Sequence, residues 1–408
     1  MTGEPMMTTA AVAAYLNVQP KTVYAYVSRN QLDRQRNGQG KESLFREADV
    51  RAFAARRRPG KIRAQGADAA GSPSIQTKIT LLGNDELYYR GRDVAALART
   101  ESYESVATLL WTGRPRPAAF EPNQDLLTLA KAVTAPLPSG TRTTDLLRIV
   151  VAAAGAADPL RFDITSAAVV NTGRALIATM VEALPIMSAP APDPEHPLAS
   201  ALWARLTAAE PTEQKTAVLN AALVLLADHD MPISTVAARA AASTRAHPYA
   251  VVEAGLSVLD GPWHGAASGL VVTMLRTAMR SGDVLGTMSD HLRTAGAVPG
   301  FGHPLYKKAD PRAAVLLAML TELRPRKRAL DVITEVAETM RSRTGVEPNI
   351  DFALAALTIL TGMPADAGET IFAVARTAGW LAHAIEEYAS EPARFRPVGR
   401  YAGEIPAV

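Results

Sequence analysis

The sequence predicts a mainly α-helical protein in which a small N-terminal module precedes a much larger helical body. Of its 408 residues, 48% are hydrophobic and only 5% aromatic, and a composition rich in Ala and Leu favours helices over strands. A chain of this length exceeds what one small core needs. The charge also changes along the chain. Residues 1–63 contain twelve Lys and Arg against five Asp and Glu, whereas the remainder is net acidic.

The N-terminal module, residues 1–58, has the order of elements of a winged helix-turn-helix. We expect a first helix opened by a threonine cap and a second helix with proline in its first turn. A short turn joins them, a glycine-containing basic segment follows as a wing hairpin, and a last helix closes the module. The first helix is residues 8–16, the turn 17–19 and the second helix 20–27. The wing is residues 36–47 and the closing helix 47–58.

This pattern resembles the winged helix-turn-helix domains of the MerR and excisionase type. The resemblance implies contact with DNA through residues 1–63, since a basic patch attracts the phosphates of a duplex. A basic face that merely meets solvent is the alternative. The residues expected to face the groove are Lys21, Thr22, Tyr24, Tyr26 and Arg29.

Residues 59–74 are rich in Gly, Ala, Ser and Pro without an apolar period, which predicts a linker. The body after it opens with two β-prone runs on either side of Gly83 and Asn84, which indicates a hairpin. A helix is expected to begin near Asp93, and the rest of the chain reads as successive helices. Residues 216–228 are apolar nearly all round and predict a buried helix.

Composition excludes several classes of function. Without cysteine the chain has no disulfide, no Cys-based zinc site and no thiol nucleophile. The longest apolar run, residues 149–157, is about half of the ~18 residues that a membrane span requires. The N-terminus contains the acidic Glu4 and lacks the pattern of an export signal. We therefore expect a cytoplasmic protein that does not use a membrane.

Three histidines and one aspartate lie in surroundings that favour chemistry. His229 follows the predicted buried helix, whereas His264 and His303 lie among glycines and other small residues. Asp351 begins an apolar helix after a proline turn. Each has an ordinary structural explanation when taken singly: a helix-terminal cation, a tight turn, a surface loop or a helix cap. A metal site at residues 228–230 is a further alternative, although the segment lacks a recognised ligand spacing.

Seven motifs, taken together and in order, resemble the citrate synthase family over residues 74–403. The resemblance implies an all-α body of two domains, a large one made of residues 75–265 and 367–408 and a small one made of residues 266–366. The motifs are TKITLLGNDELYYRG, ADH followed by ST and AAR, GPWHG, VPGFGHPLYKKADPR, PNIDF, ARTAGWLAHAIEE and RPVGRYAG.

The chemistry implied by this resemblance is the condensation of an acyl-CoA with a 2-oxo acid, usually acetyl-CoA with oxaloacetate. The methyl group of a thioester is a very weak acid and a carboxylate is a weak base, so the developing enolate needs a nearby donor. By resemblance Asp351 is the base, His264 donates to the enol oxygen, and His303 polarises and protonates the keto group. Acetyl-CoA is a substrate here, and no separate cofactor or metal is expected.

The resemblance also implies the binding residues. The substrates and product carry carboxylates, which planar guanidinium groups bind well. Arg396 would reach into the site of another subunit, which implies a homodimer. His229 would contact the oxo acid, and Lys307, helped by Lys308, would lie near the CoA phosphates. The carboxylate set is Arg312, Arg376 and Arg396, and the loop expected to cover CoA is Val298, Pro299, Gly300, Phe301 and Gly302.

Two positions depart from the family pattern. Pro232 replaces an asparagine that contacts the oxo acid, and Ser268 replaces an asparagine four residues after the histidine of the GPLHG motif. The leading hypothesis is therefore a citrate synthase, with 2-methylcitrate synthase, acting on propionyl-CoA, as its near neighbour. The alternative from another class is a DNA-binding regulator whose synthase-like body senses a metabolite.

Overall fold

The computed structural model describes the chain as two compact units, Met1–Arg63 and Ala64–Val408. The expected linker, residues 59–74, lies outside the described residues. None of the helices described is long and apolar enough to cross a membrane. The described residues are 6–16, 20–28, 32, 34–36, 43–47, 49–50, 75–189, 193–261, 264–265, 267–324, 327–395 and 403.

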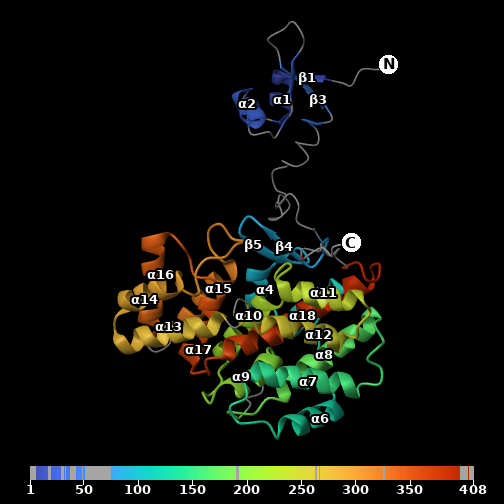
Figure 1. Ribbon diagram of the computed structural model, residues 1–408, viewed down its shortest axis with the longest axis vertical. Helices are drawn as coiled ribbons and strands as arrows, with labels where there is room; N and C mark the ends of the chain where they lie inside the picture. The colour runs from blue at the N-terminus through green and yellow to red at the C-terminus, as the bar shows by residue number, and fades with distance from the viewer. Residues whose placement is uncertain are drawn as a thin grey trace. The chain divides into compact units, whose positions relative to one another are not determined.

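The described part of the N-terminal unit includes two short helices and a three-stranded antiparallel sheet with the strand order β1-β3-β2 (Figure 1). Thr8 caps the first helix, because its hydroxyl oxygen accepts the N–H of Ala11 at 3.2 Å. The two helices and the antiparallel wing strands occur where the sequence predicts them, and the strand before the first helix is an addition. The elements are β1 (Met6–Thr8), α1 (Thr9–Leu16), α2 (Pro20–Ser28), β2 (Gln35–Arg36) and β3 (Ser43–Arg46).

The predicted DNA-facing residues of α2 do not share one environment. Lys21 and Tyr24 are exposed, and Thr22 is half-buried. The prediction for Tyr26 is wrong, because its side chain is only 9% exposed and packs in the core of this unit with Val23, one helical turn earlier. Three further predictions lie wholly or largely outside the described residues: the turn 17–19, Arg29 and the closing helix 47–58.

The larger unit begins with the predicted hairpin, which lies at one end of the helical body in Figure 1. Its turn consists of Asn84 and Asp85, one residue later than expected, and both have a positive φ, 57° and 63°. The helix after it begins at Asp93, whose carboxylate accepts two backbone N–H groups of the first turn. The elements are β4 (Thr80–Gly83), β5 (Glu86–Tyr89), β6 (Arg92–Asp93) and α4 (Val94–Thr100).

Helices form the rest of the body. The predicted buried helix is α10, in which every residue from Val218 to Leu226 is buried, and α18 is buried along most of its 22 residues. The order continues with α5 (Tyr103–Thr112), α6 (Gln124–Thr134), α7 (Thr143–Ala157), α8 (Ser166–Glu182), α9 (Pro197–Leu206), α10 (Glu213–Leu226), α11 (Ile233–Ser243), α12 (Pro248–Leu259), α13 (Ala267–Ser281), α14 (Val284–Ala295), α15 (Pro311–Glu322), α16 (Lys327–Thr344), α17 (Ile350–Thr361) and α18 (Ala367–Tyr388).

Helix α18 is the central element of this body, since it packs against helices of both groups. In the larger group these are α5, α7, α8, α10, α11 and α12, and in the smaller group α13 and α17. Helices α13, α14, α16 and α17 pack on one another, and Figure 1 shows α13, α14 and α16 to one side of the α7, α8 and α12 stack. This grouping agrees with the small domain expected at residues 266–366, whose limits remain a prediction.

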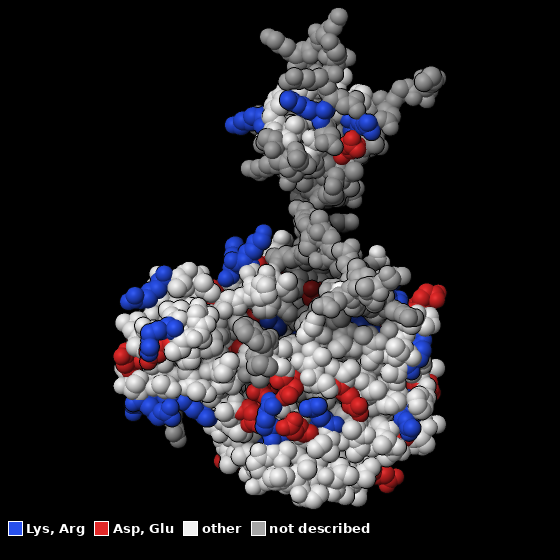
Figure 2. Space-filling view, viewed as in Figure 1, with Lys and Arg blue, Asp and Glu red and all other residues white. Residues whose placement is uncertain are grey.

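An ion-pair bridge lies where the chain passes from one group of helices to the other. Arg142, at the start of α7, donates to Asp260 at 2.8 Å and to Glu369 at 2.7 Å. Asp260 ends α12 and Glu369 lies in the first turn of α18. One side chain therefore joins the segment that leaves the large helical group to the segment that returns to it. On the face shown in Figure 2, charged side chains of both signs are interspersed over the helical body.

Candidate active site

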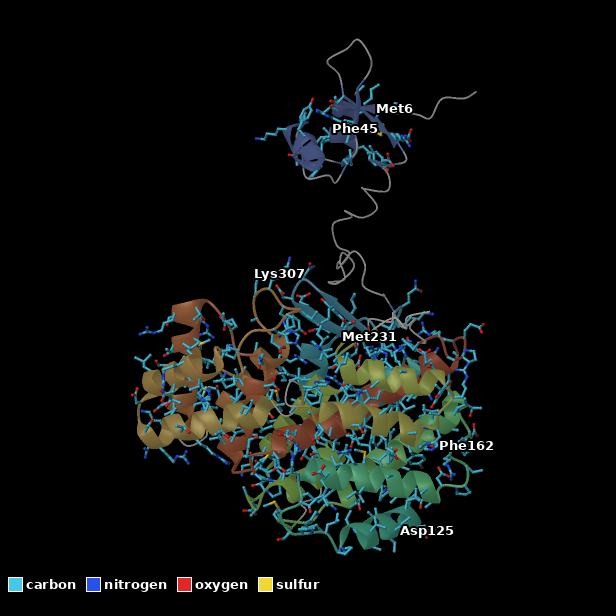
Figure 3. The ribbon with its side chains drawn as sticks, in the orientation of Figure 1. Met6, Phe45, Asp125, Phe162, Met231 and Lys307 are labelled. Carbon is cyan, nitrogen blue, oxygen red and sulfur yellow. The ribbon has the colours of Figure 1, made fainter. Side chains whose placement is uncertain are left out.

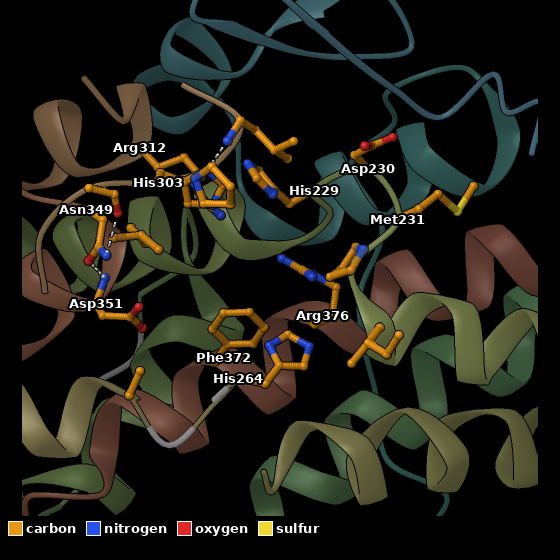
Figure 4. Close-up of a pocket in the computed structure, with 17 residues that line it drawn as sticks. His229, Asp230, Met231, His264, His303, Arg312, Asn349, Asp351, Phe372 and Arg376 are labelled. Atoms are coloured by element: carbon orange, nitrogen blue, oxygen red, sulfur yellow. Dashed lines mark hydrogen bonds between the residues drawn. The ribbon is translucent and has the colours of Figure 1, made fainter. Parts of the chain in front are cut away.

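The predicted catalytic and binding residues meet in one cavity of about 530 Å³ (Figure 4). They come from the end of α10, the segment before α13, the loop before α15, the first turns of α15 and α17, and the middle of α18. Segments more than a hundred residues apart thus form a single site. The predicted residues that line it are His229, His264, Gly302, His303, Arg312, Asp351 and Arg376.

Two glycines shape the loop that carries His303. Gly300 and Gly302 have φ values of 88° and 75°, a region that residues with a side chain rarely adopt. A Cβ on Gly300 would also lie 2.9 Å from the side chain of Val271. The glycine pattern that drew attention in the sequence therefore reflects a required backbone conformation and a close approach to α13.

The same loop is bonded to the segment that leads into Asp351. The N–H of Gly302 donates to Glu347 O at 2.9 Å, and the N–H of Asn349 donates to Gly300 O at 2.9 Å. The amide side chain of Asn349 adds a third bond, to Gly302 O at 3.0 Å. These bonds place His303 and Asp351 on adjoining parts of the cavity wall.

Asp351 lies in the first turn of α17, where the side chain of Asn349 accepts its N–H at 3.0 Å. Asn349 is thus the cap, and the Asp351 carboxylate is left to face the cavity. Among the described residues no donor lies within hydrogen-bond distance of that carboxylate. Burial raises its pKa to about 7, against the opposing effect of Arg312. Such a group is poised to take or give a proton near neutral pH.

His303 and His264 are neutral near pH 7. Burial and Arg312 lower the pKa of His303 to about 4, although Asp310 opposes the shift. Burial and Arg376 likewise lower the pKa of His264 to about 4. The Nδ1 atom of His303 accepts the N–H of Leu305 at 3.1 Å, so its proton resides on Nε2.

The Nε2 atom of His264 lies 2.7 Å from Ser234 Oγ, and its ring meets the edge of Phe372 with centroids 5.7 Å apart. A hydroxyl that donates to Nε2 leaves the proton of the neutral ring on Nδ1. Both histidines can therefore present one N–H to a bound oxygen. Figure 4 shows His264 beside Phe372, with Asp351 beyond it along the cavity wall.

His229 is buried just after the end of α10 and lies against the loop that carries His303. Its Nε2 is 2.7 Å from the hydroxyl of Tyr306, and its ring is perpendicular to that of His303 with centroids 5.1 Å apart. Burial, together with Arg312 and Arg376, lowers its pKa well below the ordinary value. It therefore acts as a neutral ring and not as the helix-terminal cation that its position in the sequence allows.

The two arginines of the cavity differ in their partners. Arg312 makes a two-pronged ion pair with Asp310, with Nε and Nη2 at 2.9 and 2.8 Å from the two carboxylate oxygens. The guanidinium edge that was expected to bind a substrate carboxylate is therefore occupied by Asp310. Of the three guanidinium nitrogens of Arg312, only Nη1 has no partner among the described residues.

Arg376 donates from Nε to the carbonyl of Leu226 at 2.8 Å, but its Nη1 and Nη2 atoms are buried without a hydrogen-bond partner among the described residues. Its guanidinium lies over the ring of Phe372 at 4.7 Å. Burial lowers its pKa to about 10, and the nearby Asp228 opposes the shift. Two buried donors aimed at a cavity are costly unless an acceptor arrives there, and a carboxylate has the matching geometry.

A buried polar cluster lies behind this wall. Asp228 accepts the hydroxyl of Thr80 and lies 3.4 Å from Nε2 of His383, whose Nδ1 is 2.8 Å from Arg239. Burial favours the neutral form of Asp228, but His383 and Arg376 outweigh it and lower the pKa of the carboxyl. His383 is thus a core histidine whose two ring nitrogens both have partners.

The alternative of a metal site at residues 228–230 receives no support. Asp228 and His229 face different partners, and within the described ranges no three His, Asp or Glu side chains are placed to share a metal ion. Of the two departures from the family pattern, Pro232 lines the cavity, whereas Ser268 is buried outside it against Gly368.

Of the residues expected to bind CoA, Gly302 and the two lysines lie beside a second cavity. Lys307 and Lys308 are exposed and line this cavity of about 220 Å³, which shares Gly302 and His303 with the first. Val298 is only 5% exposed, so its side chain belongs to the core. Arg396 lies outside the described residues.

The sequence reasoning missed four residues of the site: Asn349, Asp310, Tyr306 and Ser234. Asn349 and Asp310 lie two positions before Asp351 and Arg312, where a side chain can bond the backbone of the next helical turn, and both do so. Tyr306 and Ser234 stand inside motifs that were already singled out. Adjacency to a predicted functional residue was the available signal.

Comparison with known proteins gives the same family on several grounds. Residues 68–398 match the family described as citrate synthase, C-terminal domain, and residues 6–58 match a helix-turn-helix domain. The citrate synthase of Synechocystis sp. is 32% identical over 82% of this chain and 90% of its own length. The 2-methylcitrate synthase 2 of Corynebacterium glutamicum is 28% identical over 78% of this chain and 89% of its own.

Solved structures show the same fold. The crystal structure of citrate synthase from Thermotoga maritima aligns with a TM-score of 0.68 at 26% identity and covers 83% of this chain and 95% of its own. Citrate synthase from Thermoplasma acidophilum, solved as a ternary complex with carboxymethyl coenzyme A and oxaloacetate, aligns with a TM-score of 0.70 at 21% identity and covers 84% of this chain and 96% of its own. The predicted mainly helical fold and acyltransferase family are confirmed, and the chain belongs to the citrate synthase family, with a helix-turn-helix domain at its N-terminus.

Proposed function

We propose that this protein condenses acetyl-CoA with oxaloacetate and water to give citrate and CoA. One observation carries the proposal: a single cavity contains an aspartate whose pKa is about 7, three neutral histidines and an arginine with two buried nitrogens that lack a partner among the described residues. That set can remove a proton from carbon, donate to two oxygens and hold a carboxylate.

In the first step the Asp351 carboxylate takes a proton from the methyl group of the thioester, while the Nδ1–H of His264 donates to the carbonyl oxygen that becomes the enol. The enol carbon then attacks the keto carbon of oxaloacetate, and His303 gives its Nε2 proton to the oxygen that becomes the hydroxyl. Water finally cleaves the C–S bond, so that CoA leaves as the thiol. The tautomers needed at both histidines are those that their hydrogen bonds favour.

Binding is proposed to follow the cation positions. Arg376 offers a carboxylate its open fork, Arg312 adds its one free nitrogen, and His229 contacts the oxo acid. The loop of residues 298–302 would cover CoA, to which the buried Val298 can contribute only its backbone. Lys307 and Lys308 would lie near the phosphates. Arg396 of a second subunit would complete the site, which makes the functional unit a homodimer in the cytoplasm.

The test is thiol release by the full-length protein with acetyl-CoA and propionyl-CoA across a panel of 2-oxo acids. We expect acetyl-CoA with oxaloacetate to give the highest kcat/KM. Preference for propionyl-CoA would instead assign 2-methylcitrate synthase, a name that relatives 28% identical to this chain carry. No thiol release with any pair would favour the metabolite-sensing regulator.

DNA binding by residues 1–63 is a second proposed function. It is supported by the match to a helix-turn-helix domain and by the exposure of Lys21 and Tyr24 on α2. Figure 2 shows basic side chains on this unit. We expect full-length protein to bind duplex DNA with an affinity that falls as salt rises, and Lys21→Glu with Tyr24→Ala to weaken it. Equal binding by a chain that lacks residues 1–63 would refute this role.

A further inference from the structure

The tip of the β4–β5 hairpin contacts the loop that carries His303. The backbone N–H of Lys307 donates to Oδ1 of Asp85 at 2.6 Å, across 222 positions of sequence. Figure 3 labels Lys307 beside this hairpin. We refer to residues 303–308 as the His303 loop. A carboxylate from the start of the helical body thus bonds the loop that carries the expected acid and the expected phosphate-binding lysine.

Asp85 occupies a position in the hairpin turn that glycine or asparagine usually takes. Asn84 and Asp85 are the two central residues, both with positive φ, and the second of them is most often glycine in such turns. A residue with a side chain is less favourable than glycine in this conformation. A hydrogen bond from a backbone N–H to an ionised carboxylate is stronger than a neutral one and can offset that cost.

The other end of the hairpin is fixed to the cavity wall that carries His229. The hydroxyl of Tyr89 donates to Asp228 O at 2.6 Å and accepts the N–H of Asp228 at 3.0 Å. Next to it, the guanidinium of Arg90 donates twice to the carbonyl of Leu110, at 2.7 and 3.1 Å. The hairpin is therefore held firmly at the residue immediately before His229.

The hairpin is thus bonded to two segments of the site, and these two segments also contact each other. Its base holds the backbone beside His229 and its tip holds the His303 loop, and the two meet at the 2.7 Å contact between His229 and Tyr306. The hairpin belongs to the expected large domain and the loop to the expected small one. A bond from Asp85 therefore joins the two domains at the substrate cavity, away from the chain crossings near Arg142.

We propose that Asp85 is a positioning residue whose carboxylate latches the His303 loop to the hairpin, so that His303 and Lys307 are held in register with His229. The proposal rests on the proposed condensation activity for its kinetic consequences. Loss of the latch moves the acid and the phosphate contact together, and it leaves Arg376, on α18, in place. The displaced Lys307 therefore weakens binding of the acyl-CoA and the displaced His303 lowers kcat, whereas the carboxylate contact of Arg376 with the oxo acid is kept.

Two substitutions separate the carboxylate from the turn. Asp85→Gly and Asp85→Asn both tolerate a positive φ, but only asparagine keeps a side-chain oxygen that can accept the N–H of Lys307. We expect Asp85→Gly to lower kcat/KM for acetyl-CoA about tenfold, with KM for oxaloacetate within about twofold of the wild type. Asp85→Asn should recover most of the loss.

Amide hydrogen exchange of the full-length protein tests the latch without reference to activity. In Asp85→Gly the Lys307 amide should exchange about tenfold faster than in the wild type and in Asp85→Asn. Unchanged exchange and kinetics in Asp85→Gly, or equal losses in both variants, would overturn the proposal. If the wild type releases no CoA, the proposed function fails, and the exchange of the Lys307 amide still decides whether Asp85 holds the loop.

Discussion

The two walls of the cavity treat their charges in opposite ways. On the wall built by the loop and helices of residues 298–361, Arg312 is neutralised by Asp310 and the Asp351 carboxylate has no hydrogen-bond partner among the described residues. On the wall built by α10, α11 and α18, Arg376 keeps two nitrogens that have no hydrogen-bond partner in the part of the chain that the structure describes. One wall therefore contains an unsatisfied base and the other an unsatisfied cation.

This difference between the two walls indicates that they serve different steps of the proposed reaction. A buried carboxyl without donors holds its proton more tightly and can exchange it near neutral pH. A buried guanidinium without a carboxylate gains most when a ligand supplies one. We infer that proton transfer belongs to the first wall and substrate anchoring to the second, and the following variants can break this division.

Asp351→Asn should have the largest effect. An amide cannot take a proton from carbon, so thiol release should fall about a thousandfold or more. Oxaloacetate affinity, measured by calorimetry, should stay within about threefold of the wild type, since Arg376 is untouched. Normal turnover by this variant would remove Asp351 from the role of base.

Substitution by methionine should mainly affect oxaloacetate binding at Arg376 and mainly affect protein stability at Arg312. Arg376→Met should raise the Kd for oxaloacetate at least about thirtyfold and cost less stability than Arg312→Met, because Arg376 loses its bond to Leu226 O and its attraction to Asp228 but no direct ion pair. Arg312→Met should lower the free energy of unfolding by about 3–5 kcal/mol, because Asp310 is left buried without its cation.

The control for the arginine pair is the double variant Arg312→Met with Asp310→Leu, in which both charges are removed. It should be more stable than Arg312→Met in urea unfolding. If Arg376→Met were destabilised as much as Arg312→Met, the contrast between the two walls would be wrong.

The pH dependence should identify the base. The Asp351 pKa of about 7 means that kcat/KM for acetyl-CoA should rise with pH through about 7, since only the ionised carboxylate accepts a proton. The pKa values of His264 and His303, both about 4, keep these rings neutral from pH 6 to 8. A rate that falls between pH 6 and 8 would contradict this assignment.

The pH dependence of folding stability is a second, independent measure of the Asp351 pKa. The folded value lies above the ordinary 3.8, so the stabilisation from the bound proton is complete below about pH 4 and is lost as pH rises through about 7. Asp351→Asn should therefore lose less stability than the wild type between pH 5 and 8 in thermal melts.

The smallest effect is expected at the bridge between the two groups of helices. Arg142→Ala removes ion pairs to Asp260 and Glu369 that are partly exposed, so the loss should be about 0.5–1 kcal/mol and should shrink in 1 M salt. Arg148→Ala, which removes a local surface pair with Asp145, is the matched control and should cost less.

The sequence predicted most of the elements because their signals are local. The threonine cap, the proline at the start of α2, the β4–β5 turn and the apolar run of α10 each depend on neighbours within a few positions. The burial of Tyr26 could also have been predicted, because it is one helical turn from the buried Val23. The residues predicted to be catalytic were chosen from family motifs.

What the sequence could not supply are contacts between distant segments. Thr80 and Asp228 are 148 positions apart, and Asp85 and Lys307 are 222 apart, so no local pattern joins them. The occupied fork of Arg312 and the open fork of Arg376 look alike in sequence, since both are arginines in motifs. Only the packing around each distinguishes them.

The bonds between residues 300–302 and 347–349 have a mechanical consequence. Two backbone bonds and the Asn349 side chain hold these segments together, with His303 at the end of one and Asp351 just after the other. The proposed acid and base are therefore held at a spacing that these bonds set. A movement of the helices of residues 267–361 would carry both together and would change their distances from His229, His264 and Arg376.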